Sequence, residues 1–231
     1  MRKLMKSKFL IIVSFFAVSF FVFAEQMVYI YKKDGTKVPY VAATLDSIGF
    51  VNATSGNENG HEWVDLGLPS GTKWATCNVG AESPEDYGDY FAWGETEPKS
   101  SYYESNYTYS INPTELPLDK DAAHVNWGGD WRMPTKAEQD ELWEKCTWVR
   151  GTMNGVEGYT VTGHNGKSIF LPTTGYRYNY DLEQEGATGY YWSSSIKPND
   201  YSSAYYLRFG SNDLYRDRRY FGLSVRPVLR E

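Results

Sequence analysis

Apolar and polar residues alternate over short runs along most of this chain, and Gly, Asn, Asp or Pro separates one run from the next. Alternation with a period of two predicts β-strands that bury one face. In residues 204–209 it directs Leu207 and Phe209 inward and Tyr206 and Arg208 outward. The runs predicted to be strands of the main domain are 63–66, 73–77, 90–93, 159–162, 168–171, 190–194, 204–209 and 222–229.

Turn and helix signals lie between these runs. Asn165-Gly166 separates two of them and predicts a β-hairpin. Thr135 and Glu138 have the spacing of a capping box, which predicts a helix over residues 136–146. Residues 99–121 are polar, rich in Tyr and without periodicity, so we expect a long surface loop. Short antiparallel strands with one clear helix indicate the α+β class.

The N-terminal quarter predicts three separate segments. A basic start is followed by an apolar run and by Val22-Phe23-Ala24, which is typical of a signal peptide over residues 1–24 that is cleaved before Glu25. Residues 25–50 predict a small β-hairpin unit: residues 28–31 and 37–41 have strand composition around Asp34-Gly35, and residues 45–50 close the unit. The polar residues 51–60 read as a linker, and residues 61–231 form the main domain.

Export changes the charge and the expected surroundings of the chain. Cleavage removes four of the 23 Lys and Arg residues, which leaves 19 against 29 Asp and Glu residues and a net charge of −10. An acidic surface argues against nucleic acid and against anionic membranes as partners. The expected location is extracellular, at the cell surface or in the periplasm, with no membrane span after signal cleavage. In such an oxidising space Cys77 and Cys146 either form a disulfide or remain two buried thiols.

Half of the tyrosines lie in one late segment. Ten of 20 fall between Tyr176 and Tyr220, interleaved with Asn, Asp, Ser and Arg. Tyr supplies a large rigid contact at low entropic cost, and small polar residues supply adaptable hydrogen bonds. The mixture predicts a recognition surface for a glycan or protein ligand, and Arg226 and Asp130 are expected to be structural ions. The candidate ligand-binding residues are Tyr178, Tyr180, Asn199, Tyr201, Tyr206, Arg208, Asn212, Asp213, Tyr215, Arg216 and Tyr220.

Several segments of residues 61–227 resemble the Fibrobacter succinogenes major paralogous domain family of exported bacterial domains. The resemblance rests on residues 63–75 (WVDLGLPSGTKWA), 90–95 (YFAWGE), 131–135 (WRMPT) with Glu138, 171–175 (LPTTG), 191–195 (YWSSS) and 224–227 (SVRP). It implies a C-type-lectin-like fold, related to formylglycine-generating enzymes, with small twisted antiparallel sheets and about two helices at their sides. The hairpin unit resembles a leader unit of exported Bacteroidetes proteins. Some relatives are variable proteins of diversity-generating retroelements, whose spectrum of Tyr, Asn, Asp, Ser and Arg is similar to residues 199–203 and 212–218.

The motifs of catalysis and metal binding do not fit this chain. No Cys follows Cys146, so the C-terminal thiol pair of the formylglycine-generating enzymes is missing. Lys197-Pro198-Asn199 has Lys where a calcium-binding lectin has a carboxylate or an amide. We therefore expect no catalytic residues, no metal and no cofactor. The alternative to a recognition domain is a structural surface protein that assembles through the hairpin of residues 25–50, and an enzyme is the less favoured third class.

Overall fold

The computed structural model describes residues 27–31, 36–41, 54–210 and 218–229. The chain divides into two compact units, residues 1–52 and residues 53–231. The first unit holds strands β1 (Met27–Tyr31) and β2 (Lys37–Val41), which pair antiparallel, as predicted for the hairpin. The predicted signal peptide, the predicted turn at Asp34-Gly35 and residues 45–50 lie outside the described residues.

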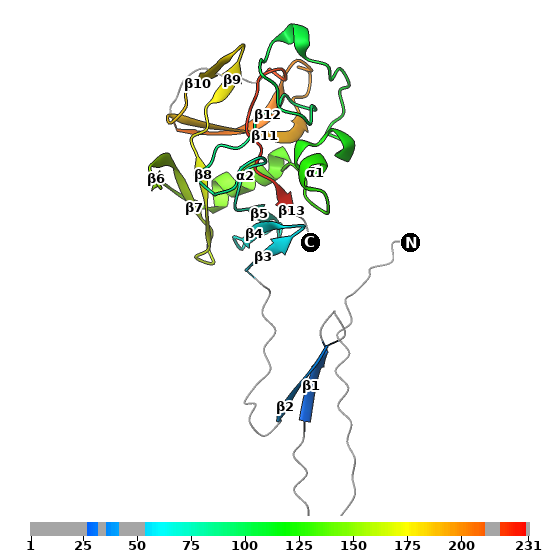
Figure 1. Cartoon of the computed structure of the whole chain (residues 1–231), viewed down its shortest axis with the longest axis vertical. Helices are drawn as coiled ribbons and strands as arrows, with labels where there is room; N and C mark the ends of the chain where they lie inside the picture. The colour runs from blue at the N-terminus through cyan, green and yellow to red at the C-terminus, as the bar shows by residue number, and fades with distance from the viewer. Residues whose placement is uncertain (1–26, 32–35, 42–53, 211–217, 230–231) are drawn as a thin grey trace, which may run out of the picture. The chain divides into compact units, whose positions relative to one another are not determined.

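The second unit contains four small antiparallel sheets, with strand orders β13-β5-β4-β3, β6-β7-β8, β11-β12 and β10-β9 (Figure 1). Its strands are β3 (Ser55–Glu58), β4 (His61–Asp65), β5 (Lys73–Ala75), β6 (Thr147–Met153), β7 (Val156–Thr162), β8 (Ser168–Pro172), β9 (Tyr176–Tyr178), β10 (Asp181–Glu183), β11 (Thr188–Ile196), β12 (Ala204–Gly210) and β13 (Val228–Leu229). The hairpin predicted at Asn165-Gly166 is confirmed, since β7 and β8 pair across it. The class is mixed α+β, dominated by small antiparallel sheets.

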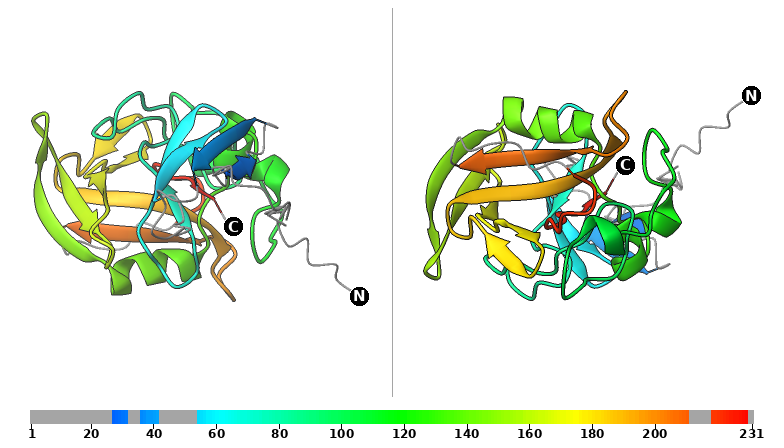
Figure 2. Two further views of the ribbon diagram at one scale, coloured as in Figure 1. Left: turned by 90° about the horizontal axis from the view of Figure 1, so that it is seen from below. Right: turned by 90° about the horizontal axis from the view of Figure 1, so that it is seen from above.

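Helices occupy little of the chain. Within the described residues the two α-helices are α1 (Ala122–Trp127) and α2 (Lys136–Lys145), and the two short 3-10 turns are η2 (Glu104–Asn106) and η3 (Leu118–Lys120). The predicted capping box of α2 is confirmed: Thr135 and Glu138 each accept a hydrogen bond from the other's backbone N–H. Helix α2 runs alongside the β11–β12 ribbon (Figure 2). No described helix has both the length and the apolar composition that crossing a bilayer requires.

Tryptophan side chains fill much of the interior. Trp93, Trp131 and Trp192 lie in one buried cluster with Phe91 and Leu223. Trp74 lies in a second cluster with Leu142 of α2 and with Leu207 and Phe209 of β12. The inward direction predicted for Leu207 and Phe209 is therefore confirmed, and β12 covers a core with that face.

Three predicted boundaries are wrong. Residues 55–58, predicted as linker, form β3 and pair with β4 through backbone bonds that need no apolar side chains. Residues 90–93 are fully buried, but Phe91 makes only an isolated bridge with Leu223. Residues 222–229 form a strand only at β13. The strand-like composition of the last two segments reflects that they are buried on both faces. A buried segment does not need a continuous row of inter-strand hydrogen bonds.

Residues 99–121 are also more buried than the predicted surface loop. Tyr102, Tyr109 and Leu116 are buried, and so is Asp121. The Tyr109 ring packs over Gly94, where a Cβ atom would come within 2.1 Å of the ring. Such contacts join residues far apart in the chain and leave no periodic pattern in the sequence.

Candidate functional site

The β9–β10 hairpin presents two tyrosines at its turn. Tyr178 is 36% exposed and Tyr180 is 70% exposed, as expected for both, whereas neighbouring Tyr176 is buried. Asn179 between them has a φ of 56°, a left-handed conformation that Asn adopts more readily than most residues. The Tyr102 N–H donates to the Asn179 carbonyl at 2.8 Å, and the Asn179 N–H donates to the Tyr102 carbonyl at 3.1 Å. These bonds fix the turn, and with it the two exposed rings.

Two further tyrosines meet this hairpin. The ring centroid of Tyr103, just before η2, lies 5.5 Å from that of Tyr180 in an edge-to-face arrangement. The ring of Tyr220 lies 6.5 Å from that of Tyr178. The sequence singled out Tyr220 but missed Tyr103, because residues 99–121 have no periodicity that shows where a side chain points.

Tyr201 is the fifth exposed or half-exposed tyrosine of this region. It is 56% exposed, in a turn that also exposes Asn199. Ser203 at the end of the turn makes an antiparallel bridge with Arg218, so the turn runs beside the segment that carries Tyr220. We name Tyr103, Tyr178, Tyr180, Tyr201 and Tyr220 the tyrosine face. The β9–β10 hairpin and the η2 loop lie at the end of the main domain away from β3, β4 and β5 (Figure 1).

Arg219, next to Tyr220 in the chain, holds the Tyr201 turn of this face in place. Its side chain is 3% exposed, and its guanidinium lies 4.7 Å from the centroid of the Trp93 ring. Nε donates to the Tyr107 hydroxyl, Nη1 to Asn112 Oδ1 and the Tyr201 carbonyl, and Nη2 to the Tyr109 and Ile111 carbonyls, at 2.6–3.0 Å. All five N–H groups of the guanidinium are thus engaged. Arg219 therefore joins residues 107–112 to the Tyr201 turn.

Tyr206 and Arg208 require a correction. They lie on the opposite face of β12 from Leu207 and Phe209, but they are half-buried and not directed freely into solvent. Tyr206 packs edge-on against Trp192, with ring centroids 6.1 Å apart, and against the Tyr190 ring at 5.8 Å with a tilt of 38°. The alternation of a strand indicates which residues share a face, and it does not show whether that face is covered.

The structure thus brings together only part of the predicted set. Tyr178, Tyr180 and Tyr220 meet, and Asn199 and Tyr201 lie on the adjoining turn. Four predicted residues fall outside the described part of the chain: Asn212, Asp213, Tyr215 and Arg216.

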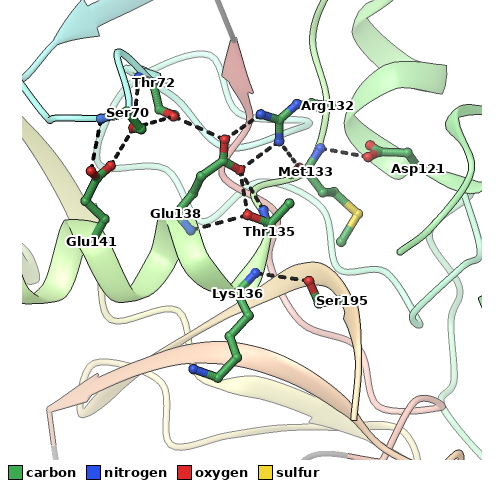
Figure 3. Close-up of polar contacts among 10 residues, drawn as sticks. All are labelled: Ser70, Thr72, Asp121, Arg132, Met133, Thr135, Lys136, Glu138, Glu141 and Ser195. Atoms are coloured by element: carbon green, nitrogen blue, oxygen red, sulfur yellow. Dashed lines mark hydrogen bonds and ion pairs between the residues drawn. The ribbon is translucent and has the colours of Figure 1, made fainter. Parts of the chain in front are cut away.

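A second polar cluster lies at the start of α2 (Figure 3). The Arg132 guanidinium makes two hydrogen bonds with the Glu138 carboxylate, one at each oxygen. Glu138 also accepts from the Thr135 N–H at 2.8 Å and from the Thr72 hydroxyl at 3.1 Å. Ser70 donates to Glu141 through its N–H and its hydroxyl. The cluster borders a cavity of about 550 Å³.

This network fastens the loop before β5 to helix α2. Its carboxylates accept hydrogen bonds from neighbouring donors, so the network stabilises the packing of the loop against the helix. Asp121 plays a similar part at α1, where it accepts from the backbone N–H groups of His124 and Met133. Burial nevertheless raises the pKa of Asp121.

Glu138→Gln is expected to lower the free energy of unfolding at pH 7 by about 2 kcal/mol, because it breaks a charge-assisted pair. Burial acts to raise the pKa of Glu138, but hydrogen bonds from Arg132 and Thr135 hold it below its ordinary value. A carboxylate whose pKa is lowered in the folded state stabilises the fold at pH values above its ordinary pKa. This stabilisation is lost as the pH falls through the pKa of the folded state. Urea unfolding of both proteins from pH 7 to pH 2 should show the difference shrinking; a constant difference would contradict this assignment. Asp121 is common to both proteins and cancels.

The two cysteines are free thiols. Of the two alternatives that the sequence left open, the structure therefore has thiols and no bridge. Burial raises the pKa of Cys146 to about 11, with a smaller contribution from Glu141, so the thiol stays protonated at neutral pH. Within the described residues, no group of three or more His, Cys, Asp or Glu is placed to hold a metal ion.

Comparison with known proteins gives no relative for this arrangement. No family model matches the chain, and neither a curated protein nor a solved structure does.

Proposed function

We propose that this chain is an exported, non-catalytic recognition protein whose main domain has a C-type-lectin-like fold and binds a glycan or protein ligand through the tyrosine face. The observation that carries the proposal is the exposure of Tyr178, Tyr180 and Tyr201 on turns that buried groups hold in place. A soluble protein that keeps large rings exposed on a rigid frame has the features of a binding surface.

Preorganisation supports binding at this face. Tyr rings carry two side-chain torsions, and here the backbone beneath them is fixed by the Tyr102–Asn179 bonds and by Arg219. Little conformational entropy remains to be lost when a partner is bound, so more of the contact energy appears as affinity. Tyrosine is also enriched among the residues that dominate binding energy at interfaces.

The fold assignment is supported by where the family-like segments lie. Trp74, Trp131 and Trp192, each from a different segment, are buried in the interior. Arg226 of the last segment is 1% exposed and donates to carbonyls of β5 and β8. The segments that carry the resemblance therefore build the frame, and the tyrosine face is carried mainly by segments outside them.

The double variant Tyr178→Ala/Tyr180→Ala is expected to lose most of the binding that the wild-type chain shows. The purified chain, residues 25–231, is first screened on a glycan and protein array. One hot-spot aromatic residue contributes at least about 2 kcal/mol, so affinity for a hit should fall by about thirtyfold or more even where only one of the two tyrosines is a hot spot. The matched control is Trp143→Ala, which removes a 51%-exposed aromatic residue on α2 and should leave affinity within about twofold.

Thermal unfolding of both variants separates loss of contact from loss of fold. Undiminished binding by the folded double variant would reject the tyrosine face. Deleting residues 25–50 tests the alternative that the β1–β2 hairpin mediates assembly. Loss of assembly in this deletion variant, with binding to the array hit intact, would favour that structural role.

A further inference from the structure

Part of the tyrosine face forms a shallow, open hollow. Its volume is about 470 Å³, and it lies between the turn of the β9–β10 hairpin and η2. Three separate segments of the chain supply its walls. The lining residues are Tyr103, Glu104, Ser105, Tyr178, Asn179 and Tyr220.

The aromatic walls are mutually braced. The rings of Tyr178 and Tyr220 are tilted by 41° to each other, 6.5 Å apart. Phe221 lies edge-on to both, 5.0 Å from Tyr178 and 4.8 Å from Tyr220. Tyr180 braces Tyr103 in the same way. Three tyrosine rings from different segments thus border one space, and the face of each ring carries partial negative charge.

The charged side chain in the lining of the hollow is a carboxylate. Glu104 is in the lining, and none of the six lining residues described is Lys or Arg. Desolvation raises the pKa of Tyr103, and Tyr180 and the negative charge of Asp181 raise it further. A second carboxylate, that of Asp181, therefore acts on a ring that lines the hollow. Arg177, between Tyr176 and Tyr178, points to the other face of β9, where its guanidinium lies 5.1 Å from the Tyr90 ring. The whole chain is acidic, with a net charge of −6.

Building on the recognition function proposed above, we propose that this hollow binds an alkylated ammonium group of the ligand. Ring faces with an adjacent carboxylate attract a cation, and a methylated ammonium is the cation that fits best, because its methyl groups contact the rings and its hydration is weak. An unmodified lysine ammonium is strongly hydrated and loses more on entering the hollow. A neutral sugar would stack on one ring and would make no use of the charge.

Choline titrated into the exported chain is expected to bind in the millimolar range and at least about fivefold tighter than 3,3-dimethylbutan-1-ol, its neutral isostere. Chemical shifts of labelled tyrosines measure both. Tyr178→Ala should abolish the choline shifts, Tyr178→Phe should retain them because the ring remains, and Glu104→Gln should weaken binding about threefold. Trp143→Ala is the unaffected control. Phosphocholine and Nε-trimethyllysine amide, compared in the same way, assign the group to a headgroup or to a modified protein.

Equal binding of choline and its neutral isostere would overturn the inference, and so would full retention of choline binding by folded Tyr178→Ala. The recognition function fails differently. An array hit that needs Tyr178 and Tyr180 but does not compete with choline leaves the tyrosine face as the binding surface and removes the ammonium ligand. An array hit whose binding is unchanged when both tyrosines are replaced would reject the tyrosine face as the binding surface.

Discussion

Arg219→Met is expected to lower the free energy of unfolding by about 4 kcal/mol and to weaken ligand binding at the tyrosine face, because the Tyr201 turn and the segment of Tyr220 lose their anchor. Methionine has a similar length but donates nothing, so five acceptors lose their donor, among them the buried carbonyl of Tyr109. Each unsatisfied buried polar group costs about 1–3 kcal/mol, and only part of this is recovered by water. A typical domain has just ~5–15 kcal/mol of stability, so the loss is a large fraction.

Arg219→Lys tests the geometry of this assignment. Lysine keeps the charge, but its ammonium cannot reach acceptors that are spread over the planar guanidinium. The stability of the Lys variant, measured by urea unfolding, should fall between those of the wild type and the Met variant. Its ligand binding should be weaker than that of the wild type. A Met variant that unfolds at the wild-type urea concentration would show that the five bonds contribute nothing.

Arg226→Met is expected to leave little or no folded protein. Arg226 is 1% exposed, and it donates to Asn78 Oδ1 at 2.8 Å, to the Ala75 and Phe170 carbonyls at 3.0 Å and to the Thr76 carbonyl. The side chain joins β5 to β8, so its loss leaves unpaired acceptors in the interior between two sheets. Removing one side of a buried charged network costs about 3–5 kcal/mol, which approaches the whole stability of a small domain.

The matched control for Arg226 is Arg150→Met. Arg150 is exposed and pairs with Glu157 at 3.3 Å on the surface of the β6–β7 hairpin. Exposed ion pairs contribute about 0–1 kcal/mol, so this variant should fold and melt near the wild type. Soluble yield and far-ultraviolet circular dichroism measure both proteins. A well-folded Arg226→Met with unchanged yield would refute the structural role.

Local signals in the sequence were enough for the elements that local chemistry determines. The capping box at Thr135 and Glu138 predicted where α2 begins, and Asn165-Gly166 predicted the β7–β8 hairpin. The structural role expected of Arg226 is confirmed by its burial and its hydrogen bonds. Asp130, in contrast, is exposed, and it makes no hydrogen bond or ion pair with the residues that the structure describes. Composition alone also indicated that tyrosine would be exposed at positions 178, 180 and 201.

Long-range packing accounts for the predictions that failed. Tyr206 lies against Trp192, and Tyr176 lies against Tyr190, on the face of the β11–β12 ribbon that other segments cover. Tyr103 joins the tyrosine face because residues 102 and 179 pair across the fold. Neither the covering of a strand face nor the pairing of distant loops leaves a periodic signal along the chain.

The most direct test of the account is to map where a partner covers the protein. Hydrogen–deuterium exchange is measured on residues 25–231, free and bound to the array hit. The account predicts slower exchange in residues 101–107, 177–182 and 199–203, with α2 and the β1–β2 hairpin unchanged. Protection confined to α2 or to the hairpin, with these three segments exchanging as in the free protein, would contradict it.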